Sequence, residues 1–188
     1  IISYDASGNP VAIATGTDGQ VLTSAGAGAQ PAFEDAAAGG KVVQVVHADE
    51  LTYSTGTTVF LLDDTIPQNT DGDEYITLAI TPTSATNKLF IEVVWSGGSN
   101  TAATMSMALF QDTTAAGLNA AAHRLHGANE HITLFMNHYM TSGTTSATTF
   151  KIRAGLNTAN TTYNNGSQGA RRFGGILATT MTITEISV

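Results

Sequence analysis

Apolar and polar residues alternate along much of the chain. In residues 88–96 every second residue is apolar, and the same period of two runs through residues 104–110, 131–140 and 148–154. This period is typical of strands with one buried face, so these segments are predicted to be antiparallel strands. The face that carries Trp95 is predicted to be buried. Weaker patterns add strand candidates at residues 41–47, 57–62, 75–81, 120–125 and 175–187.

Residues that favour turns separate the predicted strands. Gly, Asn, Asp and Ser gather at residues 71–73, 96–100, 141–143 and 164–166, where they suit tight turns. No long stretch shows the helical period of 3.6. The chain is therefore predicted to be all-β, with about eight to ten strands in two sheets that form an antiparallel, jelly-roll-like β-sandwich.

The character of the sequence changes near residue 40. Residues 1–40 hold short extended pieces between Gly, Asp, Asn and Pro, and the Ala-Gly run at residues 36–40 is typical of a hinge. We therefore expect an extended, fibre-like attachment segment at residues 1–40 and a β-sandwich knob at residues 41–188. The chain starts at Ile1 rather than Met, which indicates a fragment or a processed product.

Charge and composition exclude several classes of function. Only 12% of residues are charged, the net charge is −8, and the one adjacent basic pair is Arg171-Arg172. Phosphate binding needs clustered Lys and Arg, so nucleic acid is not expected as a partner. The chain lacks cysteine, which excludes disulfides and thiol chemistry. No apolar run approaches the roughly 18 residues of a membrane span, so no membrane insertion is expected.

Histidines and two acidic clusters are the candidates for reactive or metal-binding groups. His123 and His126 are three residues apart, a spacing that on a strand points the rings to opposite faces. The acidic clusters at residues 63–64 and 71–74 lack the ligand spacing of an EF-hand loop. No Gly-x-Ser-x-Gly motif is present. The sequence therefore predicts no catalytic residue, no metal site and no cofactor.

One predicted strand, at residues 41–47, is apolar on both faces. Val43 and Val45 lie on one side, and Val42 and Val46 lie on the other. A strand of a single sandwich needs only one apolar face. The second face indicates either burial against a neighbouring subunit or a loop that covers it.

Three further residues are candidates for a subunit interface. Val21 and Leu22 are the strongest apolar pair of the N-terminal segment, which has too few apolar residues to form a core within one chain. His138 lies on an otherwise apolar strand face. A hydrogen-bonded core position there competes with a place near a threefold axis, which would bring three imidazoles together. With Val43 and Val45, these residues favour a homotrimer.

Residues 16–33, GTDGQVLTSAGAGAQPAF, resemble the recurring fibre segment of tailed-phage structural proteins. That segment has a Gly-Thr-x-Gly-Gln-Val-Leu-Thr-Ser start, a Gly-rich stretch, and then Pro and an aromatic residue. KVVQVVHADE at 41–50, ITPTSATNKLFIEV at 80–93 and MTITEI at 181–186 are similar to strands of the knob that follows such segments. The resemblance implies a trimeric tail-fibre or virion appendage on the particle surface. Such an appendage contacts other virion proteins through its N-terminal segment and the host through its tip.

Loops are the expected contacts if the knob recognises a host, because the strands are committed to packing. Tyr163, Asn164 and Asn165 lie in a run rich in Tyr, Asn, Ser and Gly, which is typical of adaptable recognition surfaces. Asn100 and Thr101 lie in a second polar loop. These five residues are the predicted receptor contacts, for a host-surface protein or a neutral polar ligand such as a glycan. The predicted contact loops are residues 97–103, 113–119, 142–146 and 157–169.

Two other functions are compatible with a polar β-sandwich. A capsid or tail decoration protein would bind only other virion proteins and no host. A cellular lectin-like or tumour-necrosis-factor-like module would share the sandwich, but the fibre-like segment at residues 16–33 disfavours it.

Overall fold

The chain divides into two compact units, Ile1–Gly39 and Gly40–Val188. The computed structural model describes residues 2–5, 7–26, 29–35 and 40–188. The predicted hinge at residues 36–40 lies, apart from Gly40, outside the described residues.

Two β-hairpins make up the described part of the first unit. They pair β1 (Ile2–Tyr4) with β2 (Pro10–Ala12), and β3 (Gln20–Thr23) with β4 (Ala32–Asp35). Phe33 packs on Gly16, where an added Cβ would lie only 2.6 Å from the Phe33 Cγ, so glycine is required there. None of the described residues of this unit is fully buried.

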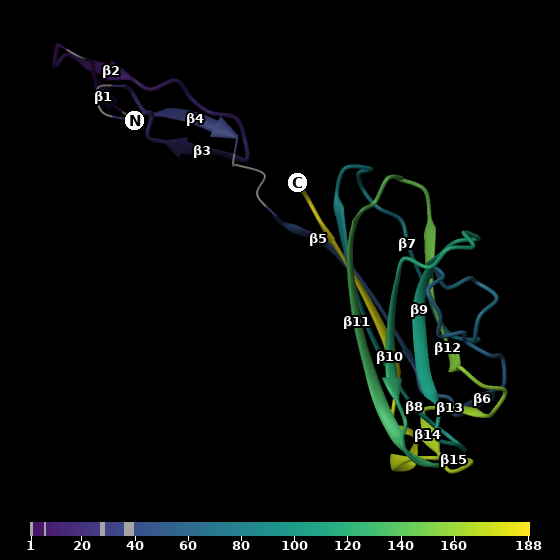
Figure 1. Ribbon diagram of the computed structural model, residues 1–188. Helices are drawn as coiled ribbons and strands as arrows, with labels where there is room; N and C mark the ends of the chain where they lie inside the picture. The colour runs from purple at the N-terminus through teal and green to yellow at the C-terminus, as the bar shows by residue number, and fades with distance from the viewer. Residues whose placement is uncertain (1, 6, 27–28, 36–39) are drawn as a thin grey trace. The chain divides into compact units, whose positions relative to one another are not determined.

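Two antiparallel sheets form the second unit (Figure 1). The four-stranded sheet has the order β10 (Asn119–Arg124), β9 (Thr104–Gln111), β12 (Thr148–Leu156), β7 (Asp73–Ile80). The six-stranded sheet has the order β5 (Val42–Glu50), β16 (Thr179–Ile186), β8 (Lys88–Ser99), β13 (Thr162–Asn164), β6 (Ser54–Gly56), with β11 (His131–Thr141) paired to β8. Between β13 and β16 the chain forms β14 (Gly166–Ser167), β15 (Ala170–Arg171) and the 3-10 turn η1 (Phe173–Gly175).

The long strands follow the order of a jelly roll. Numbered one to eight along the chain, β5, β7, β8, β9, β10, β11, β12 and β16 form sheets with the orders 1-8-3-6 and 5-4-7-2. Consecutive strands therefore lie in different sheets, except β9 and β10, which are neighbours in the four-stranded sheet, and this is the order of two Greek keys folded over each other. The prediction of an all-β, antiparallel sandwich is confirmed.

The core lies between the two sheets and is built from the inward-pointing residues of the long strands. Its largest fully buried members include Trp95, Leu89, Ile91, Met105, Met107, Leu109, Phe150 and Ile152. The predicted burial of Trp95 is confirmed, because its side chain has no exposed surface and its ring lies 6.0 Å from that of Tyr75 between centroids. Each such side chain contributes roughly 1.5–3 kcal/mol through burial.

The predicted strand at residues 57–62 is wrong. These residues belong to a loop after β6 that covers part of the outer face of the four-stranded sheet. β9 places Ala108 and Phe110 on that face, and Phe60 packs on them with 2% of its surface exposed. The Phe60 N–H donates to the Leu156 carbonyl oxygen at 2.8 Å, which fixes the loop to β12. The apolar run therefore caps a sheet rather than joining it.

Phe60→Leu is expected to lower the free energy of unfolding by about 1 kcal/mol, because leucine fills most of the space over Ala108 and Phe110. Urea denaturation measures the loss. Leu62→Ala is the matched control, since Leu62 lies in the same loop with 57% of its surface exposed. It should change the free energy by less than about 0.5 kcal/mol. Equal losses in the two variants would show that Phe60 does not anchor the loop.

A buried carboxylate joins β16, β5 and the loop before β8. Glu185 is fully buried and accepts hydrogen bonds from Gln44 Nε2 and Asn87 Nδ2, both at 2.6 Å. It also accepts from the Thr83 N–H at 2.8 Å and the Thr83 Oγ1 at 2.9 Å. Burial alone would raise the pKa of Glu185, but the bonds from Gln44, Asn87 and Thr83 outweigh it and lower the pKa from 4.5 to about 2. Glu185 is therefore charged at neutral pH.

Candidate functional site

The outer face of the six-stranded sheet is open across four strands. β11, β8, β16 and β5 lie side by side there (Figure 1). Alternate residues of these strands point away from the core, and most of them are exposed or half-buried. Within the second unit this face is therefore available to a partner, whereas the loop with Phe60 covers part of the opposite outer face.

Apolar side chains occupy one half of this open face. We call this half the valine face, and its members are Val43, Val45, Phe90, Tyr139 and Ile186. In the strand register Tyr139 lies beside Phe90, and one threonine of β16 separates Phe90 from Val45. Phe90 and Tyr139 form a tilted aromatic pair with ring centroids 6.4 Å apart. Tyr139 keeps 57% and Val45 keeps 55% of its surface exposed. Exposed apolar side chains gathered in this way are typical of interaction sites.

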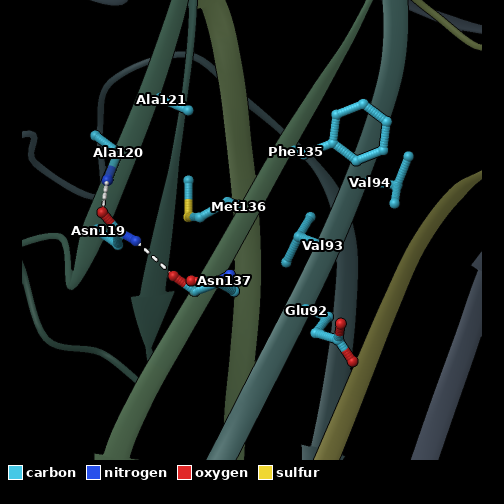
Figure 2. A pocket seen from close by; sticks show the side chains of 9 residues that line it. All are labelled: Glu92, Val93, Val94, Asn119, Ala120, Ala121, Phe135, Met136 and Asn137. Atoms are coloured by element: carbon cyan, nitrogen blue, oxygen red, sulfur yellow. Dashed lines mark hydrogen bonds between the residues drawn. The ribbon is translucent and has the colours of Figure 1, made fainter.

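The other half of the face borders a hollow of about 480 Å³, which we call the β11 hollow. β11 and β8 place two cross-strand pairs on it, Phe135 beside Val94 and Asn137 beside Glu92 (Figure 2). Residues 119–121 of β10, from the other sheet, form a further part of its lining. The volume lies within the roughly 300–1,000 Å³ of small-molecule sites.

Asn119 closes the hollow where the two sheets meet. Its Nδ2 donates to the Asn137 carbonyl oxygen at 2.7 Å, and its Oδ1 accepts from the Ala120 N–H at 2.9 Å (Figure 2). The first bond joins β10 to β11, which are edge strands of different sheets. Within the described part of the chain, the Glu92 carboxylate and the Asn137 carboxamide make no hydrogen bond to another side chain or to the backbone. Both groups are free to bind a ligand.

A polar row crosses the open face beside the valine face, and its members Glu92 and Asn137 also line the β11 hollow. His47 lies on β5, with Nδ1 2.8 Å from the Thr182 Oγ1 and Nε2 2.9 Å from the Asp49 Oδ1. The register continues from Thr182 to Glu92 on β8. The hydrogen bond between His47 and Thr182 joins β5 to β16, and the row marks the limit of the valine face.

The prediction that Tyr163, Asn164 and Asn165 form an exposed receptor loop is wrong. Tyr163 has 9% of its surface exposed, and the two asparagines have none. The Asn165 Nδ2 donates to the Glu50 carbonyl oxygen at 2.6 Å. The Thr179 Oγ1 lies 2.8 Å from the Asn164 Oδ1 and 3.1 Å from the Asn165 Oδ1. These residues therefore hold the ends of β13, β5 and β16 together.

Asn100 and Thr101 lie at the surface, between β8 and β9. Asn100 is exposed and accepts a hydrogen bond from the Thr161 N–H at 3.0 Å, while Thr101 is half-buried. Their role as receptor contacts stays a prediction. The other predicted loops are partly strand, because residues 97–99 belong to β8 and residues 162–164 belong to β13.

The predicted interface residues fall in different places. Val43 and Val45 belong to the valine face. Val21 and Leu22 lie on β3 of the first unit, with 45% and 43% of their surface exposed. His138 is half-buried on the inner side of β11, and burial lowers its pKa. His138 thus lies on the other side of the sheet from Val43 and Val45, and its place near a threefold axis stays a prediction.

None of the described His, Asp and Glu side chains gather in a group of three or more that could hold a metal ion. In the same part of the chain no helix is both long and apolar enough to cross a membrane.

Sequence reasoning missed Phe135 and Tyr139. The alternation of residues 131–140 assigns Leu134 and Met136 to the core, and the structure buries both. The same alternation leaves two aromatic residues, four positions apart, on the outer face. Exposed aromatics at this spacing are the signal that could have found the face.

No protein-family model matches the chain, and no curated protein matches its sequence. Similar solved structures include the VP2 subviral particle of infectious bursal disease virus, at 10% identity over 89% of this chain and 44% of that one, with a TM-score of 0.32. The C-terminal domain of EclA, a sugar-binding protein, has 15% identity over 78% of this chain and 88% of that one, with a TM-score of 0.34. Dimeric latent PorU from Porphyromonas gingivalis has 9% identity and a TM-score of 0.37. The similarity covers 78% of this chain, which spans 13% of the length of PorU. Similarities this weak transfer no function.

Proposed function

We propose that the chain is a structural protein of a virus particle that assembles as a homotrimer and acts in attachment to the host surface. The single observation that carries this proposal is the valine face, an apolar surface that crosses four strands and is left open by the second unit. The resemblance of residues 16–33 to a phage fibre segment supports the threefold order and the place on a particle.

A second and third copy of the same chain suit the chemistry of the valine face. Val45 and Tyr139 are more than half exposed, so a contact would remove apolar surface from water at about 25 cal/mol per Å². Thr184 is the residue of β16 between Phe90 and Val45, and it carries no charge that must be desolvated. Lys88, at the margin, already donates to the Thr141 Oγ1 at 2.7 Å. The face therefore favours association.

Assembly of three copies increases the apparent affinity for a surface when each single contact is weak. Three equivalent sites on one appendage raise the apparent affinity for a surface without any new contact within a site. In this proposal the first unit binds other virion proteins, and the second unit meets the host. The protein works by non-covalent contact, without catalysis or a cofactor, and does not bind nucleic acid or insert into a membrane.

Immunogold labelling of intact particles tests this function. Antibodies against residues 41–188 should label virus particles from the culture that expresses the chain, at their surface and before any detergent treatment. Label confined to cells, with none on particles, would overturn the proposal and favour a cellular lectin-like or tumour-necrosis-factor-like module.

Competition for adsorption separates attachment from a purely structural role. Purified chain at micromolar concentration should slow the adsorption of particles to host cells, because it occupies the same host sites. Particles that carry the chain but adsorb at an unchanged rate would identify a capsid or tail decoration protein instead.

A further inference from the structure

We infer that the β11 hollow binds a neutral pyranose of a host-surface glycan, with Phe135 as the stacking surface and Glu92 and Asn137 as the hydrogen-bonding groups. This inference rests on the proposed function, because it names the ligand class that attachment would use. The residues that carry it are those of Figure 2, which come from β8, β10 and β11.

Phe135 supplies a flat apolar surface at the mouth of the hollow. The side chain keeps 70% of its surface exposed, although it stands on a regular strand whose neighbours Leu134 and Met136 are buried. Its backbone is paired with Val94 on β8, so the ring starts from a fixed position. Phenylalanine has no hydrogen-bonding group, and its π face suits the C–H groups on the apolar side of a sugar ring.

Glu92 and Asn137 supply the polar contacts one step along the same strands. They form the next outward pair after Val94 and Phe135, about 7 Å away along the strand. A carboxylate can accept hydrogen bonds from two hydroxyls, and a carboxamide can both accept and donate. Because both side chains are free of intramolecular partners within the described chain, a sugar would displace only water. A stacked ring would thus present its edge hydroxyls to these two groups.

Charge decides the class of sugar. A pyranose with an acidic substituent would bring a negative group to the Glu92 carboxylate, in a chain whose net charge is already −8. Across the register Glu92 is followed by Thr182 and then His47, whose ring is already hydrogen-bonded to the Asp49 carboxylate. The hollow therefore favours neutral hexopyranosides and disfavours sialic acids.

The position of the hollow is compatible with the proposed trimer. Phe135 and Tyr139 are four residues apart on β11, which is about 13 Å along a strand. The polar row that runs from His47 through Thr182 lies directly beside the valine face and ends in Glu92 and Asn137 of the hollow, with Phe135 beyond it. The proposal therefore requires that a second copy on the valine face ends at this row, which leaves three hollows per trimer open to ligand.

Saturation-transfer NMR on the full chain tests the inference. The probes are the methyl glycosides of glucose, galactose, mannose and N-acetylglucosamine, with N-acetylneuraminic acid as the acidic comparison. At least one neutral glycoside should receive saturation, with a dissociation constant on the order of 1 mM, and the acid should receive none. Phe135→Ala should reduce the signal at least fivefold, and Glu92→Gln should weaken binding about tenfold.

Phe173→Ala is the matched control, because Phe173 is equally exposed at 72% but lies in the 3-10 turn η1, away from the hollow. It should leave the signal unchanged, and both variants should keep the melting temperature of the parent. No transfer to any neutral glycoside, or transfer that survives Phe135→Ala, would overturn the inference. Adsorption competition that persists in Phe135→Ala would reject the hollow while keeping the attachment function, so the two failures are distinguishable.

Discussion

Replacing Glu185 with alanine is expected to lower the free energy of unfolding by about 3 kcal/mol, among the largest effects of any single change outside the apolar core. Alanine removes the acceptor for Gln44 and Asn87 and for both donors of Thr83. The N–H and O–H groups of these three residues that now bond to Glu185 would then lack an acceptor at a buried position. At this chain length the loss corresponds to a fall in melting temperature of roughly 6–12 °C, which circular dichroism at pH 7 measures.

Acid should reproduce part of this loss in the unchanged chain. The pKa of Glu185 is about 2 in the folded state against 4.5 ordinarily, so the folded state holds its proton more weakly. The carboxylate therefore contributes its stability above about pH 4.5, and that stability is lost as the pH falls from 4.5 toward 2.

Glu185→Gln is the matched control for the pH effect, because it keeps the shape and removes the titrating group. Its melting temperature should be lower than that of the parent at pH 7, since an amide N–H₂ then faces the Gln44 donor. Between pH 4.5 and 2.5 its melting temperature should fall less steeply. Parallel pH profiles for the two chains would show that Glu185 does not hold the loop in the way described.

Val45→Glu is expected to abolish trimer formation at micromolar concentration. The substitution would bring three carboxylates into an apolar contact between copies, and each unpaired charge costs several kcal/mol when buried. The second unit itself should stay folded, because Val45 is 55% exposed within a single chain. Sedimentation velocity should show a single species with the mass of one chain.

Leu61→Glu is the control for a general effect of added charge. Leu61 is 58% exposed, but it lies on the loop that covers the four-stranded sheet, on the other side of the sandwich. Its variant should assemble like the parent. Trimers that survive Val45→Glu, or that dissociate in both variants, would remove the valine face as the interface.

Most of the fold follows from a local signal. A period of two needs only neighbouring residues to distinguish a buried from an exposed face, and it predicts the long strands and the burial of Trp95. It fails at residues 57–62, where the four apolar residues 59–62 follow one another without a period. Whether such a run joins a sheet or covers one depends on distant residues, here Ala108 and Phe110.

The candidate site was harder to predict because its residues are defined by partners far away in the sequence. Composition places Tyr163, Asn164 and Asn165 in an exposed loop, but the Asn165 amide bonds to Glu50, 115 positions away. A polar segment is exposed only where its polar atoms find no hydrogen-bond partner elsewhere in the chain, and the sequence does not show such distant partners. For β11 the alternation of the sequence does contain the answer. It assigns Leu134 and Met136 to the core and therefore leaves Phe135 and Tyr139 on the outer face.

The mass of the pure chain in solution tests the central claim most directly. Light scattering coupled to size exclusion, in native buffer at micromolar concentration, should give three times the chain mass of 19.4 kDa. The value should persist on dilution over at least tenfold, as expected for an interface that covers the valine face. A stable species with the mass of one chain would contradict the account.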